Sequence, residues 1–241
     1  MKVVILCGGK GTRSYPFTEY APKVMMPVNG SPVLVDLMRS FASQGFSDFV
    51  LAAGYRQEVL HDYFAHRNSG WRVKIVDTGD EADTGERVFR CADYIGDRFL
   101  ATYGDGLGDV DLHALVRCHE QSGAFATLTT VPLCLQYGLV VSHPNGLVEQ
   151  FLEKPRLPGY WINAGFFVFD REVFSMWEGR SLEREVLVNL AARRALNAYR
   201  HSGFWKSMDT SKDLHELNAL SLEGTPPWIR VQCTGRQCAA E

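Results

Sequence analysis

The sequence predicts an α/β domain with a mostly parallel sheet, flanked by helices and joined to a small antiparallel section. Two patterns support this prediction. Apolar segments of strand length alternate with segments of helix length over the first hundred residues. Later in the chain, a Pro-Asn-Gly turn separates two short alternating segments within residues 139–152, which is typical of a hairpin. With 241 residues, the chain is long enough for one large domain with a substantial core.

The composition is that of an ordinary globular protein. Apolar residues make up 46% of the chain and charged residues 22%, with a formal net charge of −3. This balance gives no support for a surface that binds nucleic acid. No apolar run approaches the length of a membrane span, and the N-terminus enters a strand without a signal-peptide pattern. We therefore expect a cytoplasmic enzyme that binds neither nucleic acid nor membrane.

The first half of the chain reads as alternating strands and helices. The apolar, β-branched run at 2–6 predicts a buried first strand. Ser31 as N-cap and Pro32 at the first helical position predict a helix over 33–41, which Gly45 ends. Further strands are expected at 48–54, 71–76 and 99–103, and further helices at 55–65, 84–94 and 111–121. This order predicts parallel strands connected by helices.

The second half departs from that alternation. Strands are expected at 125–131 and 161–169, and the hairpin pairs 139–141 with 148–152. Two helices are expected at 184–197 and 210–222, whereas 225–241 loses periodicity and looks like a surface-lying or frayed end.

The six cysteines are scattered without the spacing of a zinc site, so we expect free thiols. Cys7 reads as a small packing residue, because a neighbouring anionic phosphate would disfavour its thiolate. Cys233 and Cys238 are close enough in sequence to pair, but they fall in the irregular tail.

A glycine-rich loop follows the first strand. Gly8, Gly9 and Gly11 leave the backbone open to a ligand and permit positive φ angles that aim N–H groups at one anion. Arg13 and Lys23 add two positive charges, which favours a triphosphate. The loop matches neither the dinucleotide fingerprint nor the P-loop. A plain tight turn is the alternative interpretation.

Two aspartates lie at the ends of predicted elements. Asp105 stands between Gly104 and Gly106 after the fourth strand, on the same edge of the sheet as the glycine loop. Asp209 precedes the last helix. Two carboxylates with water and phosphate oxygens suit Mg²⁺. The alternatives are an Asx turn for Asp105 and an N-cap for Asp209.

Two further polar residues have open interpretations. Lys154, which precedes a proline, is either a point charge for a phosphate or a solvated surface lysine. Asn163 interrupts an apolar strand and is either a satisfied core amide or a ligand for a sugar hydroxyl.

Taken in order, these motifs resemble those of the sugar-1-phosphate nucleotidyltransferases. The shared motifs are Gly8-Gly9-x-Gly11-Thr12-Arg13, Pro22-Lys23, Gly104-Asp105-Gly106, Glu153-Lys154-Pro155, Asn163-x-Gly165 and Met208-Asp209-Thr210. A narrower resemblance, to the glucose-1-phosphate cytidylyltransferases, rests on Asp77-Thr78-Gly79, Thr102-Tyr103-Gly104-Asp105-Gly106-Leu107, Trp161-Ile162-Asn163-x-Gly165-Phe166-Phe167 and Gly203-Phe204-Trp205-x-x-Met208-Asp209-Thr210.

The resemblance implies a Rossmann-like, GT-A-like domain over 1–228, with a nucleotide-binding half at 1–122, a sugar-phosphate-binding half at 123–228 and a tail at 229–241. It implies Mg²⁺-dependent transfer of a nucleoside monophosphate to a sugar-1-phosphate, with release of pyrophosphate. The first choice of substrates is CTP, which donates CMP, and glucose-1-phosphate. A homo-oligomer is also expected. The alternatives are another NTP, an unusual sugar-like or cyclitol phosphate, or a nucleotide-sugar sensor that does not turn over.

The resemblance also implies a role for each matching residue. The residues implied for catalysis are Arg13, Lys23, Asp105 and Lys154, and those for Mg²⁺ are Asp105 and Asp209. The nucleotide would be held by Leu6, Gly8, Gly9, Gly11, Thr12, Arg13, Lys23, Thr78, Gly79, Thr84, Gly85 and Gly104. The sugar phosphate would be held by Gly138, Glu153, Lys154 and Asn163.

This sequence departs from the narrower family in three places. Glu86 replaces a glycine, which puts a carboxylate near the expected base or ribose and bears on nucleotide choice. The narrower family has an arginine before the glycine that matches Gly138, whereas this chain has Gln136 and Tyr137 there. This difference bears on sugar recognition. Members of the narrower family carry an extra stretch of roughly a few dozen residues between the positions of Phe64 and Trp71, and this chain lacks it. That stretch resembles an element that forms oligomer contacts and covers the nucleotide.

Overall fold

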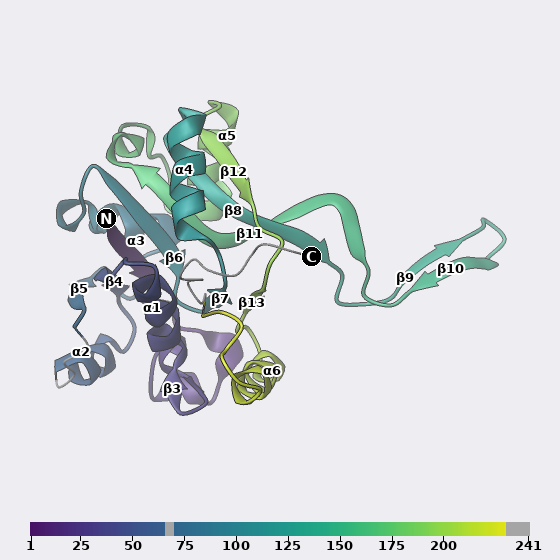
Figure 1. Cartoon of the computed structure of the whole chain (residues 1–241), viewed down its shortest axis with the longest axis horizontal. Helices are drawn as coiled ribbons and strands as arrows, with labels where there is room; N and C mark the ends of the chain where they lie inside the picture. The colour runs from purple at the N-terminus through teal and green to yellow at the C-terminus, as the bar shows by residue number, and fades with distance from the viewer. Residues whose placement is uncertain (66–69, 230–241) are drawn as a thin grey trace, which may run out of the picture.

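The computed structural model describes residues 1–65 and 70–229 and is built on a seven-stranded sheet (Figure 1). The strand order is β12-β8-β11-β6-β1-β4-β5. Strand β11 runs antiparallel to both of its neighbours, and all other adjacent pairs are parallel. The predicted mixed, mostly parallel sheet is therefore confirmed. The strands are β1 (Lys2–Leu6), β4 (Asp48–Ala53), β5 (Arg72–Asp77), β6 (Arg98–Tyr103), β8 (Ala126–Cys134), β11 (Arg156–Asp170) and β12 (Leu196–Arg200).

Helices cover both faces of this sheet. Because successive side chains of a strand point to opposite faces, Val3 and Ile5 of β1 enter one apolar cluster and Val4 enters the other. The first cluster includes buried side chains of α1 and α4, and the second includes those of α3 and α5. The helices are α1 (Val33–Ser43), α2 (Gln57–Ala65), α3 (Thr84–Arg90), α4 (Leu112–Ser122), α5 (Leu187–Ala192) and α6 (Ser211–Leu222). Burial on both sides explains the continuous apolar runs of the central strands.

Two short antiparallel pairs form separate two-stranded sheets, and one of them shapes the site. Strand β7 (Gly106–Gly108) pairs with β13 (Trp205–Ser207), so that the segment after β6 lies beside the segment before α6. Strand β2 (Pro27–Val28) pairs with β3 (Ser31–Pro32) ahead of α1.

The predicted hairpin is confirmed and projects from the body. Strands β9 (Leu139–Ser142) and β10 (Val148–Leu152) are antiparallel, and we refer to residues 139–152 as the arm. Its turn is closed by a hydrogen bond from the His143 N–H to the Leu147 carbonyl, with Gly146 at a φ of 87°. The arm extends to the right in Figure 1, and all residues of β10 are exposed.

Three expectations for the elements were wrong. Residues 184–197 are not one helix, because a π-helical turn (Leu182–Val186) leads into α5 and the chain then forms β12. The predicted helix at 84–94 is α3 followed by a separate 3-10 turn (Ala92–Tyr94). Ser31 does not cap α1, because the N-cap residue is Pro32 and the Ser31 hydroxyl instead accepts a hydrogen bond from Arg39.

The cysteines that the structure describes are free thiols. Cys7 is buried, and burial raises the pKa of its thiol far above the usual value, which agrees with a packing role. Cys233 and Cys238 lie outside the described residues. Among the described helices, none combines the length and the apolar character needed to cross a membrane.

Candidate active site

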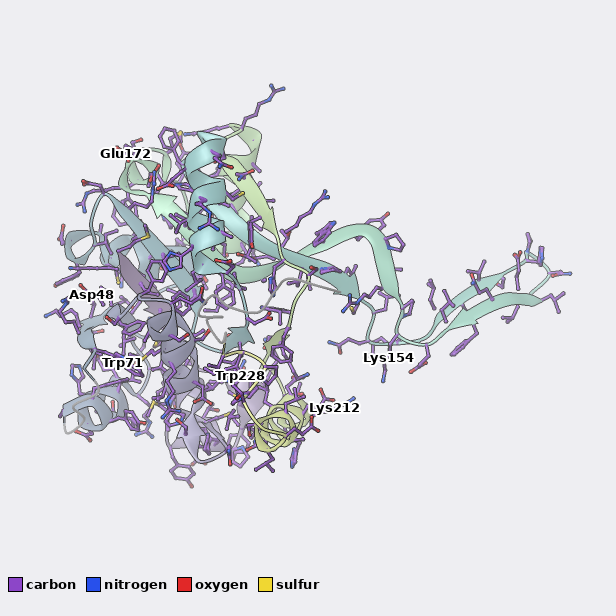
Figure 2. All side chains as sticks on the ribbon, in the orientation of Figure 1. Asp48, Trp71, Lys154, Glu172, Lys212 and Trp228 are labelled. Carbon is purple, nitrogen blue, oxygen red and sulfur yellow. The ribbon has the colours of Figure 1, made fainter. Side chains whose placement is uncertain are left out.

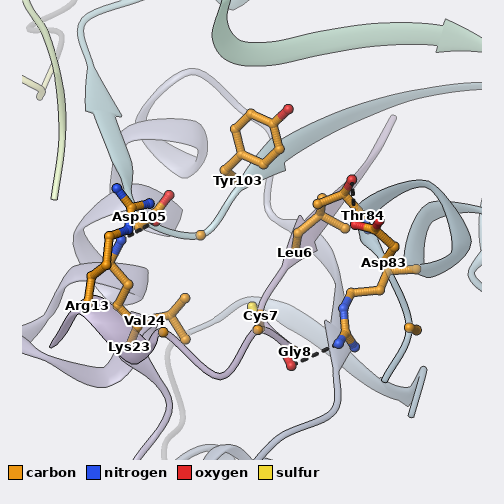
Figure 3. A pocket seen from close by; sticks show the side chains of 15 residues that line it. Leu6, Cys7, Gly8, Arg13, Lys23, Val24, Asp83, Thr84, Tyr103 and Asp105 are labelled. Carbon is orange, nitrogen blue, oxygen red and sulfur yellow. Dashed lines mark hydrogen bonds and ion pairs between the residues drawn. The ribbon is translucent and has the colours of Figure 1, made fainter. Parts of the chain in front are cut away.

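A cavity of about 290 Å³ opens at the carboxyl ends of β1 and β6 (Figure 3). Eight of the residues predicted to hold a nucleotide line it: Leu6, Gly8, Gly9, Gly11, Arg13, Lys23, Thr84 and Gly104. Asp105 lines it as well. The cavity also has wall residues that the sequence interpretation did not assign: Cys7, Val24, Ala82, Asp83, Arg87 and Tyr103. An open parallel sheet places ligands at this edge.

The glycine loop presents unused hydrogen-bond donors. Within the described residues, the N–H groups of Gly8, Gly9 and Gly11 donate to no other group of the protein. Only Gly11 has a positive φ, 58°, and a Cβ there would lie 2.8 Å from the Cβ of Lys23. Free N–H groups in a loop after a strand form a concave site for an anion. The prediction of a positive φ is confirmed at Gly11 and is wrong at Gly8 and Gly9.

The two predicted aspartates both contact Lys23, and Asp105 lines the cavity whereas Asp209 does not. The antiparallel pairing of β7 with β13 aligns them, and the Met208 N–H donates to the Asp105 carbonyl at 2.9 Å. The Nζ atom of Lys23 lies 2.7 Å from Asp105 Oδ2 and 3.1 Å from Asp209 Oδ1. An Nη2 atom of Arg13 lies 3.0 Å from the same Asp209 oxygen. The structure thus brings four of the predicted charged residues into one cluster, and Figure 3 shows three of them, Arg13, Lys23 and Asp105.

This cluster keeps Asp209 ionised. Burial acts to raise the pKa of Asp209, but hydrogen bonds from Ser207 and Lys23 outweigh it and hold that pKa below its ordinary value. The alternative N-cap role of Asp209 is wrong, because Thr210 caps α6 through its hydroxyl.

The donor set of the cluster fits Mg²⁺. The carboxylates of Asp105 and Asp209 are about one third exposed, and both already contact one cation, the Lys23 ammonium. Within the described residues, no group of three or more His, Cys, Asp or Glu side chains is arranged to hold a metal. Two carboxylates are what Mg²⁺ uses when substrate phosphates and water supply the remaining oxygens.

Asn163, which does not line the cavity, is a satisfied amide beside Tyr103, which does. Its Oδ1 accepts from the Gly165 N–H at 2.8 Å, and its Nδ2 donates to the Tyr103 hydroxyl at 3.3 Å. The Tyr103 hydroxyl in turn donates to Glu183, which also accepts from the Thr84 hydroxyl at 2.7 Å. Burial raises the pKa of Tyr103 well above its usual value, so the hydroxyl stays protonated. These contacts link β6, β11, α3 and the turn before α5.

The other predicted nucleotide residues do not line the cavity. Thr12 is the first residue of a 3-10 turn beside it. Thr78 is fully buried, and its hydroxyl donates to the Ala53 carbonyl. Gly79 accepts a hydrogen bond from Arg87 through its carbonyl. A Cβ on Gly85 would lie 2.8 Å from the Arg180 carbonyl oxygen, so this glycine is needed for close packing.

The predicted sugar-phosphate residues of the arm region also lie apart from the cavity. Lys154 is exposed near the base of the arm, and its Nζ lies 3.7 Å from Glu153 Oε1 (Figure 2). Gly138 packs against Phe151, whose Cζ would be 2.5 Å from a Cβ at that position. Their roles in sugar-phosphate binding stay predictions.

The carboxylate of Glu86 is engaged in local structure. It accepts from the Asp83 N–H at 3.0 Å, which completes a capping box at the start of α3. It also lies 3.1 Å from the guanidinium of Arg180, and this hydrogen bond is the main reason why the pKa of Glu86 is lowered.

Comparisons with known proteins agree with this architecture. The model of the family described as nucleotidyl transferase matches residues 2–223. The chain is 37% identical over 254 aligned residues to the "Glucose-1-phosphate cytidylyltransferase" of Salmonella typhi. This alignment covers 95% of this chain and 98% of that protein. The chain is 36% identical over 253 residues to the "Probable glucose-1-phosphate cytidylyltransferase" of Bacillus subtilis, covering 95% and 99%.

A solved structure of a UDP-glucose pyrophosphorylase complexed with UDP-glucose has the same fold. It gives a TM-score of 0.72 at 17% identity and covers 92% of this chain and 98% of the other. The alignment with the Salmonella typhi protein spans 254 positions, more than the 241 residues of this chain, so that protein has residues without a counterpart here. Because the family match and both sequence alignments extend over nearly the whole chain, the chain belongs to the nucleotidyl transferase family.

Proposed function

We propose that this protein is a Mg²⁺-dependent glucose-1-phosphate cytidylyltransferase, which transfers CMP from CTP to glucose-1-phosphate and releases pyrophosphate. The identity of 37% to a glucose-1-phosphate cytidylyltransferase supports the choice of substrates. The observation that carries the reaction class is the position of Lys23 between Asp105 and Asp209, beside a loop with free N–H groups.

The cavity, the charged cluster and Lys154 each have a place in this proposal. The N–H groups of Gly8, Gly9 and Gly11 would hold the phosphates of CTP, and Arg13 and Lys23 would neutralise their charge. Asp105 and Asp209 would hold Mg²⁺ against the phosphates. When bound, Mg²⁺ supplies positive charge at the phosphate oxygens. Lys154 would bind the phosphate of the sugar substrate.

The reaction needs electrostatic help more than a base. The sugar phosphate has a second pKa near 6, so at neutral pH it is already mostly the dianion that attacks the α-phosphorus. Two unit charges about 4 Å apart repel each other by roughly 1 kcal/mol in water and about 4 kcal/mol at an effective dielectric constant of 20. Cations fixed around the α-phosphate convert this repulsion into stabilisation of the transition state and align the in-line displacement.

The test is pyrophosphate release with purified protein and Mg²⁺. CTP, UTP, dTTP, GTP and ATP are each combined with glucose-1-phosphate and with a panel of other sugar-1-phosphates, and each reaction is repeated with EDTA. Fastest release with CTP and glucose-1-phosphate, lost with EDTA, is the expected result. Release with another pair only would overturn the substrate assignment and keep the reaction class. No release with any pair, together with stabilisation by an NTP, would favour a sensor.

A further inference from the structure

The carboxylates of Asp105 and Asp209 are brought together by a very short pair of strands. Strand β7 has the sequence Gly-Leu-Gly and pairs with the three residues of β13, and we refer to this pair as the ladder (Figure 1). At the end of the ladder next to the carboxylates, the Met208 N–H donates to the Asp105 carbonyl at 2.9 Å. Short, glycine-rich strands specify their register weakly. The position of Asp209 relative to Asp105 therefore depends on contacts outside the ladder.

A contact between His201 and Asp109 lies at the other end of the ladder. The carboxylate oxygen Oδ1 of Asp109 lies 2.9 Å from Nε2 of His201. The same nitrogen lies 3.2 Å from the Phe204 carbonyl oxygen, which also accepts from the Asp109 N–H at 3.1 Å. Asp109 directly follows β7, whereas His201 and Phe204 precede β13. The contact therefore joins the two strands of the ladder beyond their last paired residues.

His201 is itself held by the seven-stranded sheet. It directly follows Arg200, the last residue of β12, and its N–H donates to the Thr130 carbonyl of β8 at 2.8 Å. The residue is only 8% exposed, so its ring is fixed by packing. The histidine thus connects the ladder to the central sheet.

Gly203 makes room for this contact. A Cβ at position 203 would lie 2.4 Å from Asp109 Oδ1 and 2.7 Å from Cε1 of His201. The backbone that leads from His201 to β13 therefore passes directly against both groups, and a side chain at this position would push them apart.

The Trp205 indole also holds β13, but against a different strand. Its Nε1 donates to the Ala164 carbonyl of β11 at 2.8 Å. This hydrogen bond places β13 relative to β11, whereas the contact of His201 with Asp109 places β13 relative to β7. The two contacts therefore have separate effects, and only the second acts on the spacing of the strands that carry Asp105 and Asp209.

We propose that His201 is a positioning residue for the metal site: by holding Asp109, it fixes the register of β7 against β13 and so the spacing of Asp105 and Asp209. This inference rests on the proposed function. A slip of one residue moves a strand by about 3.3 Å and turns its side chains to the other face. Mg²⁺ demands a near-ideal geometry of its oxygen ligands, so such a slip would remove the site.

The test compares the wild type with D109A, H201A, the double variant D109A/H201A and H201Q. Glutamine keeps a nitrogen donor on a side chain of similar reach, so H201Q is the conservative variant. H119A is the matched control, because His119 is another buried histidine beside an aspartate. Its Nε2 lies 3.3 Å from Asp170, which is paired with Arg98 at the start of β6. Urea unfolding of each variant checks that the protein is folded.

Two quantities are measured for each protein. The first is the free Mg²⁺ concentration that gives half-maximal pyrophosphate release at saturating CTP and glucose-1-phosphate. The second is the rate of hydrogen exchange at the Met208 N–H, followed by NMR without substrates. It is divided by the rate at the Gly104 N–H, which donates to the Leu6 carbonyl of β1 and reports opening of the central sheet.

For D109A and H201A we expect the Mg²⁺ requirement to rise about tenfold and the exchange ratio of Met208 to Gly104 to rise by a similar factor. The double variant should lose no more than either single variant, because the two residues act as one contact. H201Q should stay close to the wild type in both quantities. H119A should lower the stability in urea and leave both quantities unchanged.

Three results would overturn the inference: an unchanged Mg²⁺ requirement in folded D109A and H201A, equal acceleration of exchange at Met208 and Gly104, or a double variant whose loss is the product of the single losses. If the alanine variants do not fold, D109N removes the charge and keeps the size of the side chain. A raised Mg²⁺ requirement in D109N then supports the inference, and an unchanged one contradicts it. A wild-type protein that releases no pyrophosphate would overturn the proposed function, whereas the exchange ratio would still test the register.

Discussion

The ammonium group of Lys23 lies 2.7 Å from a carboxylate oxygen of Asp105 and holds it at the wall of the cavity. The same ammonium contacts Asp209 at 3.1 Å. The lysine side chain is only 10% exposed, so this contact is largely removed from water. One cation holds the two carboxylates close together, which is the arrangement that a divalent ion bound to phosphate requires.

Replacing Asp105 by Asn should abolish turnover and leave the fold intact. The variant removes one negative charge from the cluster while it keeps the size of the side chain, and we expect pyrophosphate release to fall by about 10²-fold or more. Circular dichroism and urea unfolding check the fold. Asp48→Asn, at the opposite edge of the sheet in an exposed pair with Arg72, is the control and should retain activity. Near wild-type release by the Asp105 variant would refute its assignment to the metal.

Replacing Lys154 by Ala should affect the sugar substrate selectively. Lys154 is exposed and lies apart from the cavity that would hold the NTP, so its loss should raise the KM for glucose-1-phosphate far more than the KM for CTP. Lys212→Ala, an exposed lysine of α6, is the matched control. Steady-state rates with each substrate varied in turn provide the measurement. Equal damage to both KM values would remove Lys154 from this role.

Shortening the arm should leave the body stable. The side chains of β10 are exposed, and an isolated two-stranded hairpin contributes little stability of its own. Replacement of residues 140–151 by a short Gly-Ser linker should shift the melting temperature by no more than about 2 °C and leave the affinity for CTP unchanged. Light scattering of the variant and of the full chain would show whether the arm forms subunit contacts. A large loss of melting temperature in a monomeric protein would contradict the independence of the arm.

His119 should make stability depend on pH. Its side chain is fully buried beside Asp170, with Arg98 and Glu120 in the same cluster, and burial lowers its pKa below the ordinary value of 6.5. As the pH falls below 6.5, His119 becomes protonated in the unfolded chain but stays neutral in the folded chain, because its pKa there is lower. The free energy of unfolding therefore decreases. The slope from this one group is at most about 1.4 kcal/mol per pH unit.

Urea unfolding between pH 7.5 and 5.5 measures this effect, with His119→Gln for comparison. The wild type should lose stability toward acid more steeply than the variant, whatever their absolute stabilities. Parallel curves for the two proteins would show that His119 does not titrate differently in the folded and unfolded states.

The strands and helices that could be predicted are those whose residues match their local structure. Residues 2–6 are largely apolar and β-branched, residues 48–53 are largely apolar, and both segments form central strands. The strand at 196–200 was missed because its sequence, Leu-Asn-Ala-Tyr-Arg, has little β preference, and its pairing with β8 decides its structure. The turn before it contains Arg194 at a φ of 56°, where no glycine marks the break.

The site was predicted as far as its residues lie in short motifs. Asp105 and Asp209 each have a recognisable neighbourhood, and the structure brings them to one lysine. Arg87 was missed because an arginine within a helix of mixed polarity is usually solvated, and nothing local shows that it turns inward. Tyr103 and Glu183 are 80 positions apart, so their hydrogen bond could not be inferred from spacing.

The pairing of β7 with β13 has a consequence for how the chain folds while it is being synthesised. Lys23 and Asp209, which contact each other beside this pair, are 186 positions apart in the chain. A nascent chain can form β1, the glycine loop and β6 well before Asp209 leaves the ribosome, but its charged cluster still lacks the second carboxylate. Contacts between such distant segments form only after a large loop closes. The charged cluster is therefore completed only after residue 209 has been synthesised, and a chain truncated before that residue carries the glycine loop without the second carboxylate.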